Sequence, residues 1–200
     1  MIESLAAETA GKYAGVALGE LPTVKAVRSI FHATGVDPTR YRPSSESLLR
    51  RAVKGPVKGK GLYFINSAVD VVNYYSLKTL LPMGLFDADR IHQPIEFRAG
   101  RAGETYQGVG RDVLNLEGFP LLADAEGPFG SAVSDSVRTR VQESTTRLLW
   151  VTFVPDGPSG DVASPDPDGG LPASDIVEFA AVMIRFNGGV VDKNTVVHTA

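Results

Sequence analysis

The densest polar cluster of this 200-residue chain is the run Ser134-Asp135-Ser136-Val137-Arg138-Thr139. A guanidinium group such as that of Arg138 can hold a carboxylate or a phosphate through two parallel hydrogen bonds. Ser134 and Asp135 would place a hydroxyl and a carboxylate beside it. The run is also typical of an N-capped turn that ends in an exposed arginine. The run therefore has two interpretations. It either binds substrate through Ser134, Asp135 and Arg138, or it is a simple turn.

Few other side chains are available for acid-base chemistry. Glu104 follows Gly103 in a turn, where its carboxylate could act as an acid or base, bind an amine, or face solvent. An unperturbed imidazole titrates in a range that permits base chemistry. For the three histidines we nevertheless expect a core or surface position (His32), a turn position (His92) and a place in the C-terminal tail (His198).

The composition limits the kinds of chemistry that the chain can perform. With 43% hydrophobic and 22% charged residues, the chain is ordinary for one globular domain. It has no cysteine, which excludes disulfides, thiolate zinc sites and cysteine nucleophiles. HExxH, P-loop and GxSxG motifs are missing, so we expect no metal and no cofactor. No apolar run of about 18 residues is present. We therefore expect no membrane contact and a cytoplasmic location.

Positive charge is concentrated between residues 40 and 60. Seven basic residues face one acid there, so this stretch carries +6 within a net charge of −3. Such a patch can attract a polyanion by releasing its counterions. A solvated helix face followed by a Gly/Lys loop has the same composition. The residues expected to contact phosphates are Arg42, Arg50, Arg51, Lys54, Lys58 and Lys60.

Two amphipathic helices are expected around this patch. The first covers 23–34, ends at Gly35, and buries Val24, Val27, Ile30 and Phe31. The second covers 44–53, with Ser44 or Ser45 as its N-cap.

A loop at 55–61 and a short strand at 62–65 should follow. Asn66 can then cap a third helix at 67–81, with an inward face made by Val69, Val72, Ser76, Leu77 and Leu80. Asn73 lies on that face. A buried amide needs hydrogen-bond partners. Asn73 is therefore either a bracket to neighbouring backbone or a polar contact in a pocket.

The second half of the chain has the short alternating runs that predict strands, at 95–98, 105–109, 119–122 and 148–154. A Pro/Gly/Asp/Ser-rich surface loop at 155–173 and a last helix at 175–187 are expected to follow. These patterns predict one α+β domain. We expect the chain to consist of an N-terminal segment (1–21), this domain (22–190) and a C-terminal tail (191–200).

Several motifs resemble a known domain in order and spacing. Val69-Asp70-Val71-Val72-Asn73-Tyr74-Tyr75 and Leu81-Pro82-Met83-Gly84-Leu85-Phe86-Asp87 resemble the Val-Asp-x-Thr-Asn-Tyr and Gln-Pro-Met-His-Ala-Phe-Asp elements of the B3/B4 editing domain in the phenylalanyl-tRNA synthetase beta subunit. The strand at 95–98 with its Gly-Glu turn and the glycine-rich run at 127–131 resemble its next elements. The resemblance covers roughly residues 22–190.

The resemblance implies a mixed β-barrel or sandwich core flanked by helices. It also implies a pocket that hydrolyses tyrosine wrongly attached to phenylalanine tRNA, without metal or covalent intermediate. Asn73 falls on the pocket asparagine of the family. Gly127, Phe129 and Gly130 fall in the loop where small residues leave room for the substrate. The family histidine and threonine are replaced by Gly84 and Val72, and a late-strand glutamate aligns with Trp150.

These observations support two functions of different kinds. The first is a tRNA-binding protein with an amino-acid pocket that hydrolyses mischarged aminoacyl-tRNA in trans, with Glu104 and Asn73 as catalytic candidates. The second is a non-catalytic module that binds an amino acid, a small metabolite or tRNA. A purely structural protein is a third class. The sequence leaves the substrate and the oligomeric state open.

Overall fold

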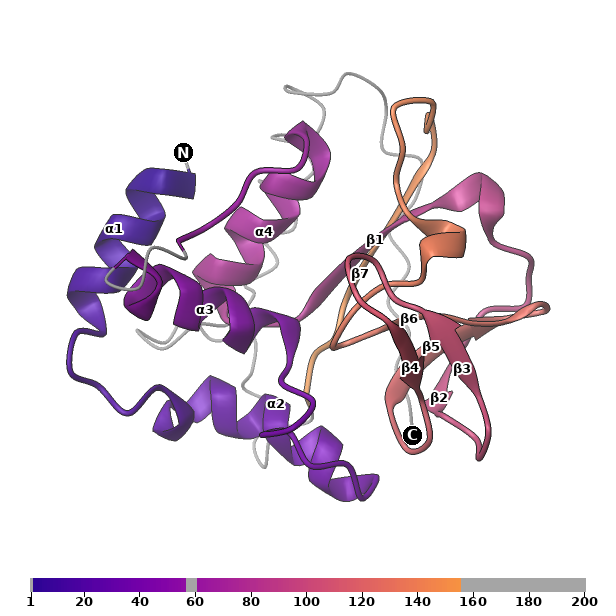
Figure 1. The fold of residues 1–200 in the computed structure, drawn as a ribbon, viewed down its shortest axis with the longest axis horizontal. Coiled ribbons are helices and arrows are strands. Elements are labelled where there is room, and N and C mark those ends of the chain that lie inside the picture. The colour runs from indigo at the N-terminus through magenta and orange to yellow at the C-terminus, as the bar shows by residue number, and fades with distance from the viewer. Residues whose placement is uncertain (1, 57–60, 156–200) are drawn as a thin grey trace.

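The computed structural model describes residues 2–56 and 61–155, and Figure 1 shows helices on one side and strands on the other. The α-helices are α1 (Ile2–Lys12), α2 (Pro22–Ala33), α3 (Ser44–Lys54) and α4 (Ser67–Thr79). The strands are β1 (Met83–Asp87), β2 (Glu96–Ala99), β3 (Thr105–Gln107), β4 (Val113–Asn115), β5 (Pro120–Asp124), β6 (Gly127–Ser131) and β7 (Leu148–Thr152). Short 3₁₀ turns are η1 (Leu18–Glu20), η3 (Ala88–Arg90) and η4 (Val137–Thr139). The α+β prediction is confirmed.

The helical half forms around the predicted amphipathic faces. α2 begins with Pro22 at its first turn and buries Val24, Val27 and Phe31, and Gly35 follows it with a positive φ of 78°. α3 begins at Ser44, so the residue at the N-cap position is Pro43 and no side chain caps the helix. The serine cap predicted for this helix is therefore wrong. α1 lies within the predicted N-terminal segment, and its contacts with α3 and α4 make it part of the helical half.

The end of α4 directs the chain into the sheet half. Asn66 caps the helix as predicted, because its side chain accepts a hydrogen bond from the amide of Val69 at 2.9 Å. Leu80 then adopts a left-handed backbone with a φ of 60°. Such a conformation is costly for a residue with a branched side chain and needs support. Ser76 Oγ supplies it by donating to the carbonyl of Leu81 at 2.8 Å.

The strands form three small antiparallel sheets within the described residues, ordered β1-β7, β2-β5-β6 and β3-β4, and these do not close into a barrel. The predicted strands at 95–98, 105–109, 119–122 and 148–154 correspond to β2, β3, β5 and β7. The glycine-rich run at 127–131 is itself a strand, β6. The strand predicted at 62–65 is absent, because those residues pair with no strand in the described part of the chain. The loop predicted at 155–173 falls, apart from Pro155, outside the described residues, as does the helix predicted at 175–187.

Three hydrophobic clusters hold these elements together. The largest lies in the sheet half and includes Phe86, Phe119 and Phe129, together with Val27 and Phe31 from α2. A second joins the four helices. A third packs α4 against β1 and β7. Because α2 and α4 bury side chains against strands, the two halves share their cores.

The described part of the chain has no helix long and apolar enough to cross a bilayer.

Candidate functional site

The carboxyl group of Asp135 lies between two glycines of neighbouring segments. A Cβ atom on Gly84 in β1 would lie 3.1 Å from Asp135 Oδ1, and one on Gly130 in β6 would lie 3.5 Å from it. Asp135 is held there by a β-bridge to Gly130, and its carbonyl accepts a hydrogen bond from the amide of Val109 at 2.9 Å. The sequence places these three residues up to 51 positions apart, and the fold makes them neighbours.

The surroundings of Asp135 favour its neutral form. Burial of the carboxyl group raises its pKa to about 7, although the backbone amide of Leu85 donates to it and partly opposes this shift. A carboxyl group with a pKa near neutrality can accept a proton from water at physiological pH and release it again. Asp135 is therefore a candidate for acid-base chemistry, whereas its sequence context marks it only as a member of the polar run.

The ring of Phe86 covers both glycines. A Cβ atom on Gly84 would lie 2.5 Å from Phe86 Cζ, and a Cβ atom on Gly130 would also collide with this ring. Phe86 is fully buried and packs edge-to-face on Phe129, with ring centroids 5.0 Å apart. The glycines are therefore required by the packing of Phe86. Phe129, expected to bind substrate, is itself fully buried in the core.

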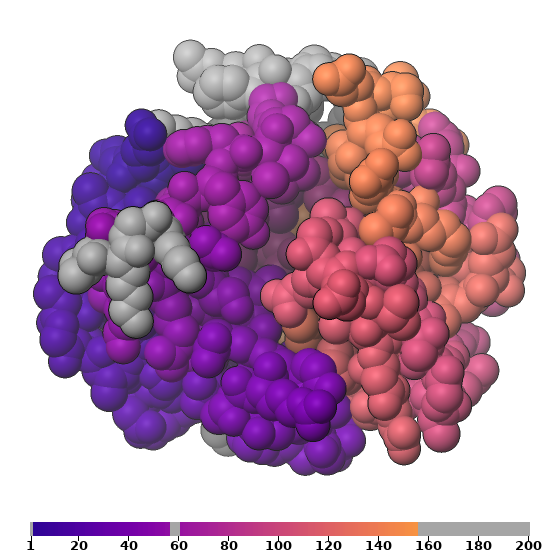
Figure 2. Space-filling model, viewed as in Figure 1, coloured from indigo at the N-terminus to yellow at the C-terminus, as the bar shows by residue number. Residues whose placement is uncertain are grey.

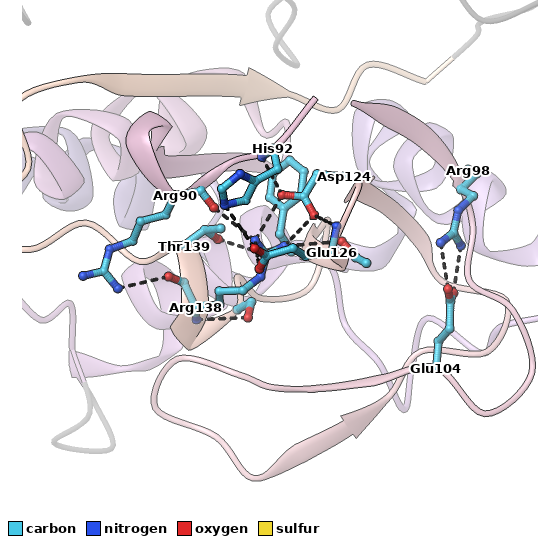
Figure 3. A network of polar contacts seen from close by, with 11 residues as sticks. Arg90, His92, Arg98, Glu104, Asp124, Glu126, Arg138 and Thr139 are labelled. Atoms are coloured by element: carbon cyan, nitrogen blue, oxygen red, sulfur yellow. Dashed lines mark hydrogen bonds and ion pairs between the residues drawn. The ribbon is translucent and has the colours of Figure 1, made fainter. Parts of the chain in front are cut away.

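Arg138 lies in a separate ion-pair network (Figure 3). Its guanidinium group donates to Asp124 at 2.8 and 3.0 Å, to Glu126 at 3.3 Å and to the carbonyl of Arg90 at 3.0 Å. The Asp124 side chain is fully buried. Burial alone would raise the pKa of Asp124, but the hydrogen bonds from Arg138 and from backbone amides hold it below its usual value. The guanidinium thus stabilises the β5-β6 turn, next to Gly127.

Glu104 is also paired and lies apart from the Arg138 network (Figure 3). Both carboxylate oxygens accept hydrogen bonds from Arg98, at 2.7 and 2.8 Å, and one also accepts from the amide of Arg101 at 2.7 Å. The bidentate bond from Arg98 holds the pKa of Glu104 below its ordinary value. A carboxylate with a lowered pKa is a weak base, so this geometry favours a structural role for Glu104.

Asn73 lies on α4, which packs against β1, and is partly buried. Within the residues that the structure describes, its side chain makes no hydrogen bond. The bracket to neighbouring backbone is therefore not formed there. Trp150 on β7 pairs with Leu85 on β1, one residue from Gly84. Its ring packs in the cluster that contains Val72.

Ser134 forms part of a tight turn before Asp135. Its carbonyl accepts hydrogen bonds from Ser131 Oγ at 3.0 Å and from the hydroxyl of Tyr106 at 2.5 Å. Its amide donates to Ser131 Oγ at 3.3 Å. These bonds fix the backbone that presents Asp135. They leave the Ser134 hydroxyl near Gly108.

Two of the predicted phosphate-binding arginines converge on one buried carboxylate. Glu46 Oε1 lies 2.7 Å from Arg50 Nε and 3.5 Å from Arg42 Nε, and Arg28 from α2 donates to both oxygens at 2.8 Å. Burial alone would raise the pKa of Glu46, but the hydrogen bonds from Arg28 and Arg50 lower it. Three positive charges surround one negative charge, so the cluster keeps a positive excess at the surface. Arg28 lies outside the basic stretch at 40–60, so charge clustering along the sequence did not point to it.

The remaining basic residues of the patch differ in their surroundings. Arg51 and Lys54 are exposed on α3, and the Arg51 guanidinium lies 4.9 Å from the ring centroid of Tyr63. Lys54 borders a shallow hollow of about 440 Å³ that Tyr13 and Val53 also line. Lys58 and Lys60 fall outside the described residues.

The two described histidines do not join Asp135. His32 is exposed on α2. His92 is exposed beside the Arg138 network, where its Nε2 lies 3.1 Å from Glu126. Among the residues that the structure describes, no cluster of His, Asp and Glu could hold a metal ion.

The arrangement can be compared with known proteins. A profile of the B3/4 domain matches residues 26–157. This chain belongs to the B3/4 domain family. The family assignment extends from α2 to the residues just after β7 and so includes Asn73, Gly84, Asp135 and Arg138.

Curated relatives of this B3/4 domain protein match over a limited region. The phenylalanine-tRNA ligase beta subunit of Bartonella henselae is 37% identical over 91 residues, which cover 44% of this chain and 11% of that subunit. The corresponding subunit of Xanthomonas campestris is 31% identical over 119 residues, covering 58% of this chain and 14% of that subunit. This chain therefore spans only a small part of the relatives that it matches.

A solved structure gives a weaker match to the B3/4 domain protein. It is an N-terminal fragment of the phenylalanyl-tRNA synthetase beta subunit from Pyrococcus horikoshii, 20% identical, with a TM-score of 0.40. The match covers 62% of this chain and 40% of that chain.

Proposed function

We propose that this protein binds aminoacyl-tRNA in the cytoplasm and hydrolyses the ester of mischarged tRNA in trans, with Asp135 as the general base. The observation that carries the proposal is the carboxyl group of Asp135 between Gly84 and Gly130. Membership of the B3/4 family supports the substrate class, since related regions occur in phenylalanine-tRNA ligase beta subunits.

The proposed reaction needs only one proton acceptor. Ionised Asp135 takes a proton from a water molecule while the water oxygen attacks the ester carbonyl. The tetrahedral intermediate then collapses, and the proton passes from Asp135 to the departing ribose oxygen. The free amide of Asn73 would orient the amino acid or the ribose, and such positioning lowers the barrier without covalent catalysis.

The tRNA would be held by the basic helix α3. Arg42 and Arg50 belong to a cluster with more positive than negative charge, and Arg51 and Lys54 are exposed beside it. Figure 2 shows that the surface between the helical half and the sheet half is hollowed on the face drawn. An acceptor end that enters from α3 toward β1 would follow this hollow.

A deacylation assay over a panel of mischarged tRNAs tests the proposal. The wild-type rate should rise with pH and level off above about 7, because only ionised Asp135 accepts a proton. Asp135→Asn should lower the rate by roughly 100-fold or more, the range of a general base. Asp112→Asn, which changes an exposed acid, is the matched control. No turnover on any substrate by the wild type would refute the enzymatic function.

One observation favours a second function, a binding module without catalysis. The ring of Phe86 occupies the space beside Gly84 into which a histidine side chain would extend. The protein would then bind an amino acid, a small metabolite or tRNA without hydrolysing an ester. Calorimetry with free amino acids and gel shifts with tRNA at two salt concentrations separate these ligands, since phosphate contacts weaken steeply with salt.

A further inference from the structure

Two neighbouring aromatic rings project from the segment before α4. Tyr63 is 50% exposed and Phe64 is 55% exposed, and Ile65 after them is 59% exposed. Large apolar side chains that gather on a surface are more informative than scattered ones, because they mark interaction sites. Tyr63, Phe64 and Ile65 follow one another directly in the chain.

The backbone of this segment is anchored at both ends. Leu62 packs on the cluster that joins the four helices. The amide of Ile65 donates to Asp70 Oδ1 at 3.0 Å, and Asn66 caps α4 directly afterwards. The segment pairs with no described strand. Contacts of Leu62 and Ile65 therefore anchor the backbone on either side of the two exposed rings.

Positive charge lies beside the rings. The Arg51 guanidinium is 4.9 Å from the ring centroid of Tyr63, and this contact links the aromatic segment to α3. Lys54 is exposed one turn further along the helix. Exposed aromatic rings beside basic side chains are the combination that binds single-stranded nucleic acid, with bases stacked on the rings and phosphates on the cations.

We propose that Tyr63 and Phe64 form a stacking surface for unpaired bases of an RNA strand, with Arg51 contacting its backbone. The proposal rests on the proposed function only for the choice of RNA as the partner. A protein partner or the protein's own chain would use the same apolar area, but neither would require the adjacent cations. The surface lies outside the Asp135 site, so it adds a contact to the RNA and does not take part in hydrolysis.

The test uses the full chain and single-stranded RNA oligonucleotides without an amino acid. Tyr63→Leu and Phe64→Leu keep apolar area but remove the ring, and Tyr63→Trp and Phe64→Trp keep the ring. Each leucine variant should lower the affinity about tenfold, while the tryptophan variants should bind as tightly as the wild type or more tightly. Val113→Ala changes a valine that is 62% exposed on β4 and is the matched control.

The dependence of RNA affinity on salt concentration distinguishes base stacking from contacts with phosphates. The leucine variants should leave the slope of log affinity against log salt unchanged, whereas Arg51→Gln should reduce it by about one. Fluorescence of the introduced tryptophan at position 63 should be quenched when the oligonucleotide binds.

The outcomes are distinct from those of the deacylation assay. Full affinity in the leucine variants, or absence of oligonucleotide binding by the wild type, would overturn the stacking surface. Lowered thermal stability of the leucine variants with unchanged RNA affinity would also overturn it, because the rings would then serve packing. If the oligonucleotides bind as predicted while mischarged tRNA is not hydrolysed, the surface stands and only the proposed enzymatic function fails.

Discussion

Asp135 Oδ1 lies 3.1 Å from the position that a Cβ atom on Gly84 would take. This relationship joins the polar run at 134–139 to the motif that contains Gly84. Arg138, three residues after Asp135, takes no part in this contact, because its guanidinium group is bound to Asp124 and Glu126. The chemistry of the polar run is therefore divided between one carboxyl group at the glycine pair and one structural arginine.

The pH dependence of stability should report on Asp135. Burial raises the pKa of Asp135 to about 7 in the folded protein, from an ordinary value of 3.8 in the unfolded chain. The folded state therefore binds more protons between these values, and the stabilisation from protonated Asp135 is lost as the pH rises through 7. Urea unfolding at pH 5 and pH 8 should show a loss of stability that Asp135→Asn reduces. The same pH dependence in both proteins would contradict the assignment.

Substitution of Gly84 should be destabilising. Gly84→Ala places a methyl group 2.5 Å from Phe86 Cζ, and overpacking of this kind costs roughly 1–3 kcal/mol of unfolding free energy. Gly84→His should cost more, because a larger side chain meets the same Phe86 ring. Gly11→Ala on α1 is the control, since nothing lies within 4 Å of its Cβ position, and it should leave stability equal or higher. Thermal melts that rank the two alanine variants equally would refute the packing argument.

Loss of Arg138 should weaken the fold. Arg138→Gln leaves the buried Asp124 carboxylate without its guanidinium, which should cost roughly 2–4 kcal/mol in denaturant unfolding. The exposed pair between Arg147 and Asp89, at 2.7 Å, offers a control. Arg147→Gln should change stability little, because exposed pairs contribute little. If Arg138→Gln is equally harmless, Arg138 is not the structural partner of Asp124.

Glu46 should stabilise the arginine cluster by balancing its charge. Glu46→Gln removes the only carboxylate within 4 Å of Arg42 and Arg50 among the described residues, so their repulsion is no longer opposed. We expect a loss of roughly 3 kcal/mol at low salt, and stabilisation of the variant by sulfate or phosphate. Glu20→Gln, in an exposed pair with Lys25, should show neither effect. Equal behaviour of the two variants in thermal melts with and without phosphate would contradict this role.

Helices α2, α3 and α4 and four of the strands could be predicted because their signals are local, whereas α1 was not predicted. Apolar residues at helical spacing predicted α2 and α4, and alternating runs predicted β2, β3, β5 and β7. The Asn66 cap was predicted for the same reason, since its bond reaches only three residues along the chain. The motifs around Asn73 and Gly84 were enough to indicate the family that the B3/4 match establishes.

The prediction of a strand at 62–65 was wrong because a strand needs a partner strand. Its residues have β propensity, but the sheets of the described chain form elsewhere, so Tyr63 and Phe64 remain at the surface. Conversely, the glycines at 127 and 130 suggested a loop, and pairing with β5 makes this run a strand. Pairing is a property of the fold and leaves little trace in a short segment.

The sequence by itself determined helices α2, α3 and α4, strands β2, β3, β5 and β7, the family motifs and which side chains were available for chemistry. The tertiary structure alone decided which of them meet: Asp135 with Gly84, Arg138 with Asp124, Glu104 with Arg98, and Arg42 with Glu46. The physical reason is that the pKa of a carboxyl group depends on its burial and on the charges a few ångströms away. Those neighbours come from distant parts of the chain, so spacing along the sequence cannot specify them.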